Sequence, residues 1–209
     1  MSGNIYLTGA VRGLVAEGER VVSIMQKVTP NIVALSISKE GLTGLTQITD
    51  IEESDTKPAN IEEEIYMRGL AEFGEVIRPP PCFSMAVKDA LKTGTPIKAL
   101  DMDDVHYTAA YCKYVSTMDM MRQGRSEKRF TKYLFLSETP QDFVMEWDEL
   151  VNRLAGYRDL ENAREEWLAK GLSRLSLKHS KILAIVELER LAGLERHLKS
   201  LKCDFEIVQ

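Results

Sequence analysis

The amino-terminal part of the chain changes its hydrophobic period twice. Residues 4–8 form a short apolar run that ends at Gly9, which is typical of a β-strand. Apolar side chains then recur at helical spacing across residues 13–28, which predicts an amphipathic helix. Pro30 interrupts this pattern, and the apolar, β-branched residues 32–37 predict a second strand. A strand, a helix and a strand of these lengths predict a βαβ unit with a parallel strand pair and a right-handed crossover.

The next part of the chain contains shorter elements. The acidic residues 49–60 include a proline and show no apolar periodicity, so we expect a surface loop. Glutamates open a predicted helix over residues 61–73, where the positive end of the helix dipole favours acids. Three consecutive prolines at 79–81 predict an extended connector, because they have no amide hydrogens to donate. A helix over 84–91, with Ser84 as its N-cap, is expected to follow.

A third strand is predicted at residues 97–100, immediately before an acidic cluster. From residue 106 to residue 178 the pattern is helical, with interruptions expected near Gly124, Pro140 and Gly156.

The carboxyl-terminal part returns to strand and helix. Residues 181–186 are apolar without alternation, as in a central parallel strand that is buried on both faces. A helix over about 191–201 and a strand over 205–208 are expected to follow. The chain is therefore predicted to be a single α/β domain over residues 1–209. Its sheet is expected to be mainly parallel, with flanking helices and a helical insertion of about 104–178 in the middle third.

Composition narrows the classes of function. The chain is 44% hydrophobic and 28% charged, and its net charge is −5, which argues against a nucleic-acid partner. The short basic run at 122–129 is expected to be a solvated turn between helices. No signal peptide is recognisable and no window is apolar enough to span a bilayer, so we expect no membrane association and a cytoplasmic location. Cys82, Cys112 and Cys203 are widely spaced and are expected to be free thiols.

Polar residues follow the predicted strands at the edge where open α/β sheets place their sites. Arg12 follows the first strand, Ser36 and Ser38 end the second, and Asp101 follows the third; Glu187, Glu189 and Arg190 follow the strand at 181–186. Arginines and carboxylates in one place allow two interpretations. The first is an ion-pair network that closes the cleft, and the second is a pocket that holds a small anion or zwitterion through bidentate arginine contacts.

Asp101, Asp103, Asp104 and His106 are the densest group of potential acid–base residues or metal ligands. Their spacing is compatible with a hard cation, but it is not an EF-hand pattern, and an acid just before a helix more often caps that helix. We favour the cap at Asp103 or Asp104, with a metal site of Asp101, Asp103 and His106 as the alternative. No nucleophile elbow, dinucleotide fingerprint or P-loop occurs, so no cofactor is expected.

The segments Gly9-Ala10-Val11-Arg12 and Ala184 to Arg190 carry a resemblance to a known family. Together with the order of elements, they resemble the TraB / pheromone-shutdown (PrgY-like) family, which is related to the TIKI-type metal-dependent hydrolases. Arg12 and Arg190 stand where that family carries histidines, and Ser36 and Ser38 stand at its glutamate and aspartate positions. A guanidinium remains protonated and cannot ligate a metal. The resemblance therefore implies a hydrolase scaffold whose metal ligands have been replaced.

The expected function is that of a non-catalytic, TraB-like cytoplasmic protein that binds a small anion or a protein partner at the strand-end cleft. Two alternatives remain open. One is a hydrolase, which could be metal-dependent, built on Asp101, Asp103, Asp104 and His106. The other is an oligomeric scaffold, for example a homodimer formed through the helical insertion.

Overall fold

The computed structural model describes residues 3–47 and 60–209, with residues 127–129 described by their backbone alone. Nearly all of the predicted acidic loop lies outside these residues. The described chain forms a parallel five-stranded sheet in the order β3-β2-β4-β1-β5. The strands are β1 (Asn4–Ala10), β2 (Ile32–Leu35), β3 (Ile97–Ala99), β4 (Lys181–Glu187) and β5 (Phe205–Ile207). The predicted α/β class and parallel sheet are confirmed.

The neighbours of β1 differ from the prediction. β1 and β2 are parallel, but they do not pair, because β4 lies between them and bonds to both. Leu183 and Ile185 of β4 point into one hydrophobic core, while Ile182 and Ala184 point into the other. A strand that is apolar on both faces gains most from the middle of a sheet. The apolar run at 181–186 therefore determines the strand order more strongly than sequence proximity does.

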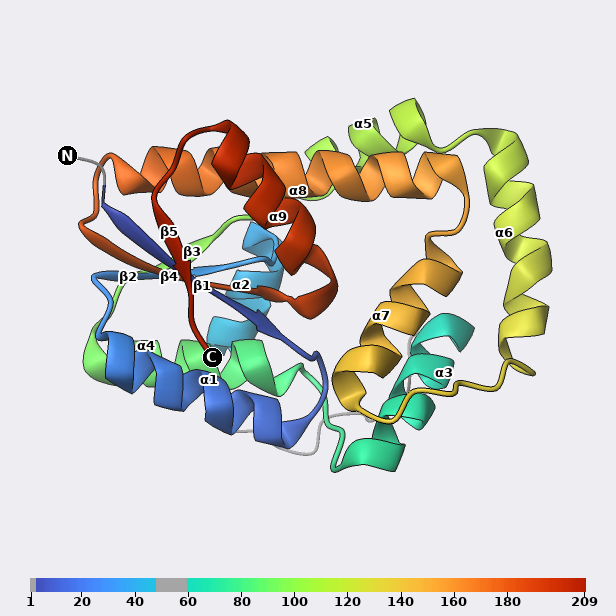
Figure 1. Cartoon of the computed structure of the whole chain (residues 1–209), viewed down its shortest axis with the longest axis horizontal. Coiled ribbons are helices and arrows are strands. Elements are labelled where there is room, and N and C mark those ends of the chain that lie inside the picture. Colours follow the sequence, from blue (N-terminus) through green and yellow to red (C-terminus); the bar gives the residue numbers. More distant parts are fainter. Residues whose placement is uncertain (1–2, 48–59) are drawn as a thin grey trace.

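Two helical layers cover the sheet (Figure 1). On one face lie α1 (Val15–Val28) and α4 (Pro81–Thr93), with α2 (Lys39–Gln47) beside α4. On the other face lie α8 (Ala155–Ser176) and α9 (Leu188–Ser200), and α5 (Asp104–Tyr114) packs along α8. Burial of one apolar face of each helix against the sheet stabilises both layers.

A third group of helices stands beyond the carboxyl edge of the sheet (Figure 1). We call it the helical lobe: α3 (Ile61–Leu70), the 3₁₀ turn η1 (Ala71–Phe73), α6 (Thr117–Phe130) and α7 (Pro140–Val151). Its core contains the aromatic side chains Tyr66, Phe130, Phe143 and Trp147. The lobe therefore combines α3, which precedes β3 in the sequence, with α6 and α7, which belong to the predicted insertion.

Several predicted boundaries were wrong, and local chemistry explains them. Gly124 lies within α6, because a glycine in an exposed helix costs only about 1 kcal/mol. The basic run at 122–129 is accordingly helix and not a turn. Helix α4 begins at Pro81 and not at Ser84, because proline is well tolerated in the first helical turn. Helix α2 was not predicted; it has no buried residue, and the Ser38 hydroxyl accepts the Gly41 N–H at its start.

Gly69 is required by the packing of the helical lobe. A Cβ at this position would lie 2.4 Å from the ring of Phe143, which is 1% exposed and cannot move away. We expect Gly69→Ala to destabilise the protein by about 1–3 kcal/mol through overpacking. Gly44→Ala is the matched control: it lies in α2 with nothing near the added Cβ, and we expect it to stabilise by up to about 1 kcal/mol. Urea unfolding of the two variants checks this, and equal effects would contradict the packing described.

Candidate functional site

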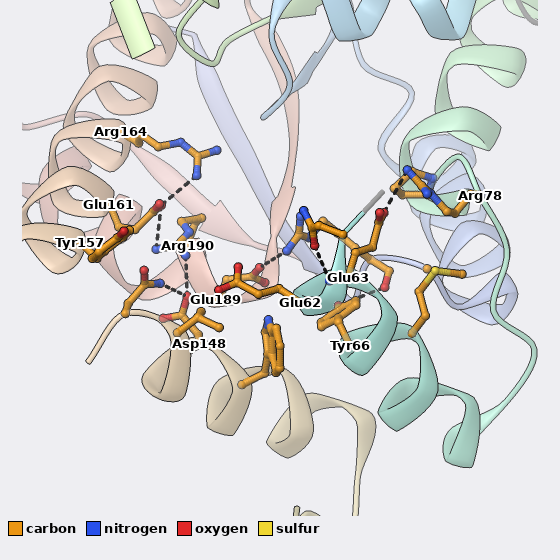
Figure 2. Close-up of a pocket in the computed structure, with 18 of the residues that line it drawn as sticks. Glu62, Glu63, Tyr66, Arg78, Asp148, Tyr157, Glu161, Arg164, Glu189 and Arg190 are labelled. Atoms are coloured by element: carbon orange, nitrogen blue, oxygen red, sulfur yellow. Dashed lines mark hydrogen bonds and ion pairs between the residues drawn. The ribbon is translucent and has the colours of Figure 1, made fainter. Parts of the chain in front are cut away.

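A cavity of about 790 Å³ lies between the carboxyl edge of the sheet and the helical lobe. Its wall combines arginines and acids with tyrosines and Trp147. Figure 2 shows a row of paired charged side chains on the left, which runs from Arg164 through Glu161 and Arg190 to Asp148. Glu63 and Arg78 form an ion pair on the opposite side. The volume is within the range of small-molecule sites, which is about 300–1,000 Å³.

The turn that carries Arg12 is held by a buried clamp. The Glu17 carboxylate accepts the Val11 N–H at 3.0 Å and also binds the Arg20 guanidinium at 2.8 Å. Arg20 in turn donates to the Gly9 carbonyl at 2.5 Å. These contacts hold the end of β1 against the start of α1, so that Arg12 is directed toward the cavity.

Arg12 makes one hydrogen bond through its guanidinium. Nη2 donates to Glu189 Oε1 at 3.0 Å, and Nε is buried without a hydrogen-bond partner in the part of the chain that the structure describes. Tyr66 orients the residue, because its ring lies 5.5 Å from the guanidinium carbon and its hydroxyl donates to the Arg12 carbonyl. Withdrawal from bulk water opposes the positive charge, but Glu189 and Glu187 outweigh it and raise the pKa of Arg12. The residue is therefore a permanent cation with unused hydrogen-bonding capacity.

Arg190 is saturated by carboxylates. Its guanidinium lies 2.5 Å from Asp148 of α7, and 3.2 Å and 3.8 Å from Glu161 and Glu165 of α8. Burial raises the pKa of Asp148 and of Glu165, although Arg190 opposes the shift in both. Glu165 approaches closely only because residue 193 is glycine: a Cβ there would lie 1.9 Å from its carboxylate.

Arg164 occupies a similar position on the other side of Glu161. It pairs with Asp101 at 2.5 Å and with Glu161 at 2.8 Å, and it lies 4.0 Å from Glu187. Ser36 donates to Glu187 at 2.5 Å behind the cavity wall. Burial opposes the charge of Glu187, but Arg12 and Arg164 outweigh it and lower its pKa. Glu187 therefore stays ionised between two cations.

The structure separates the predicted site residues into two groups. Arg12, Glu189 and Arg190 line the cavity, whereas Ser36, Asp101 and Glu187 support the wall from behind. Arg12 and Arg190 share the cavity but make no contact with each other; each pairs with acids. Ser38 caps α2 instead of joining the site. The ion-pair network of the first interpretation is therefore present, but it surrounds a cavity and does not close it; the binding of an anion stays a prediction.

Sequence reasoning missed the partners that come from helices. Asp148, Glu161 and Arg164 supply most of the network. Their spacing along α7 and α8 is that of ordinary solvated helix faces, where acids and bases alternate. The apolar faces at 143–154 and 160–175 locate the helices but do not indicate what their polar faces meet.

The Asp101–His106 cluster is divided between structural roles. Asp103 is the N-cap of α5: its carboxylate accepts the His106 N–H at 2.9 Å and contacts His106 Nδ1 at 2.5 Å. The hydrogen bonds from His106 lower the pKa of Asp103. Asp101 turns away to Arg164. The predicted cap at Asp103 is confirmed, and no group of three or more potential metal ligands occurs in residues 3–47 and 60–209.

The structure also bears on the cysteines and on the question of membrane-spanning helices. Cys82, Cys112 and Cys203 are free thiols, as predicted. None of the helices in the described part of the chain is both long and apolar enough to cross a membrane.

No protein-family model matches this sequence, and no curated protein matches it. The resemblance to the TraB family therefore stays a prediction.

The carboxylates around Arg190 predict a pH-dependent variant. Arg190→Met leaves Asp148, Glu161 and Glu165 without their shared cation, and we expect a loss of about 3–5 kcal/mol near neutral pH. Arg190 lowers the pKa of Asp148 and of Glu165 in the folded state, so its removal raises both pKa values further above those of the unfolded chain. The loss should therefore shrink as the pH falls from about 7 to about 5.

Urea unfolding at both pH values measures this effect. Arg196→Met is the control on the same helix, because Arg196 also contacts Glu165, at 3.4 Å, but its side chain is 65% exposed. An exposed pair contributes at most about 1 kcal/mol. Equal losses in the two variants, or a loss that grows at lower pH, would show that Arg190 is not the central cation.

Proposed function

We propose that this protein binds a small, acid-bearing molecule in the strand-end cavity, with the acid on Arg12, and does not transform it chemically. The observation that carries the proposal is the state of the Arg12 guanidinium. It lies on the wall of a cavity of about 790 Å³, gives one hydrogen bond to the described residues and keeps a buried Nε without a partner among them. A buried donor without a partner is costly, and a carboxylate or phosphate oxygen would satisfy it.

The other two arginines of the network serve a different purpose in this proposal. Arg164 and Arg190 each contact at least two carboxylates, so an incoming anion would have to displace an existing partner. Their contribution is to hold α7 and α8 in place around the cavity. This assigns ligand recognition to Arg12 and wall rigidity to Arg164 and Arg190.

The wall also supports a binding role over a catalytic one. Among the described residues that line the cavity, there is no serine, cysteine or histidine, and the carboxylates of Asp148, Glu161 and Glu189 are engaged in ion pairs with arginines. Ser36 and Cys82 are buried outside the lining, and burial raises the pKa of the Cys82 thiol. His106 is engaged with Asp103.

A thermal-shift screen with small carboxylates and phosphates tests the proposal, because a ligand that binds the folded state raises the Tm by mass action. We expect at least one acid to raise the Tm. We also expect Arg12→Met to weaken its binding about ten- to a hundredfold, which is the effect of losing a charged hydrogen bond. Arg12→Lys keeps the charge but loses the planar guanidinium, so its affinity for the acid should lie between that of the wild type and that of Arg12→Met.

Arg174→Met is the matched control, since Arg174 is exposed on α8 and does not line the cavity. It should bind like the wild type. Mass spectrometry of the ligand after incubation should recover it unchanged. The proposal fails if no acid raises the Tm, if the two methionine variants bind alike, or if the ligand is converted.

A further inference from the structure

Glu189 has an unused hydrogen-bond acceptor, and its ion-pair partner Arg12 has an unused donor. Its Oε1 accepts from Arg12, whereas its Oε2 is buried and has no partner within residues 3–47 and 60–209. The side chain is 4% exposed and belongs to the cavity wall. One ion pair thus leaves a donor without a partner on the cation and an acceptor without a partner on the anion. Because they share this pair, the two groups lie close together.

The charge balance of the network points to a ligand that brings its own positive charge. Among the described residues, the guanidinium groups of Arg12, Arg164, Arg190 and Arg196 pair with a larger set of carboxylates: Asp101, Asp148, Glu161, Glu165, Glu187 and Glu189. An anion without a cationic group would enter a region that already has an excess of negative charge. An ammonium group on the same ligand removes that repulsion and gives Glu189 a partner.

A second acceptor without a partner lies elsewhere on the wall. Gln123 donates through Nε2 to Glu62 at 3.2 Å and to the Val151 carbonyl at 3.3 Å, which leaves its buried Oε1 unsatisfied. Among the described residues of the lining, two buried acceptors have no partner, Glu189 Oε2 and Gln123 Oε1, and one buried donor has none, Arg12 Nε. This surplus of acceptors also favours a ligand that carries N–H groups.

We propose that the ligand is an α-amino acid. Its carboxylate binds Arg12 and its ammonium group binds Glu189, because the α-amino acid head carries both charges on neighbouring atoms. The side chain extends into the rest of the cavity, where the wall includes Trp147, Tyr111 and Tyr157. The inference rests on the proposed function, since it requires Arg12 to hold the acid, and it adds the class of molecule and the role of Glu189.

The test compares molecules that differ by one charged group. The standard L-amino acids are screened by thermal shift and calorimetry. L-leucine is accompanied by 4-methylpentanoate, which lacks the amine, and by 3-methylbutylamine, which lacks the carboxylate. L-phenylalanine is accompanied by 3-phenylpropanoate and 2-phenylethylamine. Any other amino acid that raises the Tm is tested with its own deaminated and decarboxylated counterparts. We expect an amino acid to bind at least about tenfold more tightly than either counterpart.

Glu189→Gln tests the residue itself. It keeps the size of the side chain and removes the charge, so the preference for the amino acid over its deaminated counterpart should fall from at least about tenfold to about one. Glu195→Gln is the control on the same helix; Glu195 pairs with Lys199 at 2.6 Å and does not line the cavity, so the preference should persist. The comparison of ligands uses the wild-type protein and does not depend on the folding of either variant.

The outcomes separate the two proposals. If deaminated acids bind as tightly as amino acids and Arg12→Met weakens both, the inference is overturned and the proposed function stands. If amines bind without a carboxylate and neither Arg12→Met nor Glu189→Gln changes this, both proposals are overturned. A preference for amino acids that Glu189→Gln leaves intact would overturn the role of Glu189.

Discussion

The pairing of buried charges at the carboxyl edge of the sheet is the constraint on which this site depends. Arg190 lies in the first turn of α9, which directly follows β4, and its side chain is 9% exposed, so its charge requires carboxylates within reach. These come from α7 and α8, which belong to the lobe and to one helical layer. The same need at Arg164 joins α8 to the end of β3 through Asp101. Electrostatic pairing therefore acts together with the apolar packing of Val11, Leu14 and Leu188 to place the lobe relative to the sheet.

The network around the cavity does not use every charged group equally. Arg164 and Arg190 share Glu161 and are enclosed by acids, whereas Arg12 has only Glu189 and the ring of Tyr66. A fully matched network would have left no group for a ligand, and an unpaired one would have destabilised the fold. The partial match leaves a donor on Arg12 and an acceptor on Glu189 within one ion pair of the cavity wall, and both proposals rest on it.

The sequence predicted elements well wherever burial imposes a period. The continuous apolar residues of β4 and the helical spacing of α1 and α3 gave the right type of element, within a few residues of its ends. Prediction from the sequence failed at exposed positions, where burial does not select the type of element. Helix α2 has no buried residue and contains two glycines, and α6 passes through Gly124 where a break was expected. Local capping by Ser38 and the low cost of an exposed glycine decide those cases.

The sequence by itself determined the α/β class and the edge of the sheet where polar groups gather. It also placed Arg12, Glu189 and Arg190 at that edge, because the end of each apolar run shows where a strand ends. Only the tertiary structure decided which charges meet. The insertion of β4 between β1 and β2, and the docking of α7 and α8, bring Asp148, Glu161 and Arg164 to the site from distant positions. Ion pairs depend on distances of a few ångströms in space, and the spacing of residues along a helix cannot specify them.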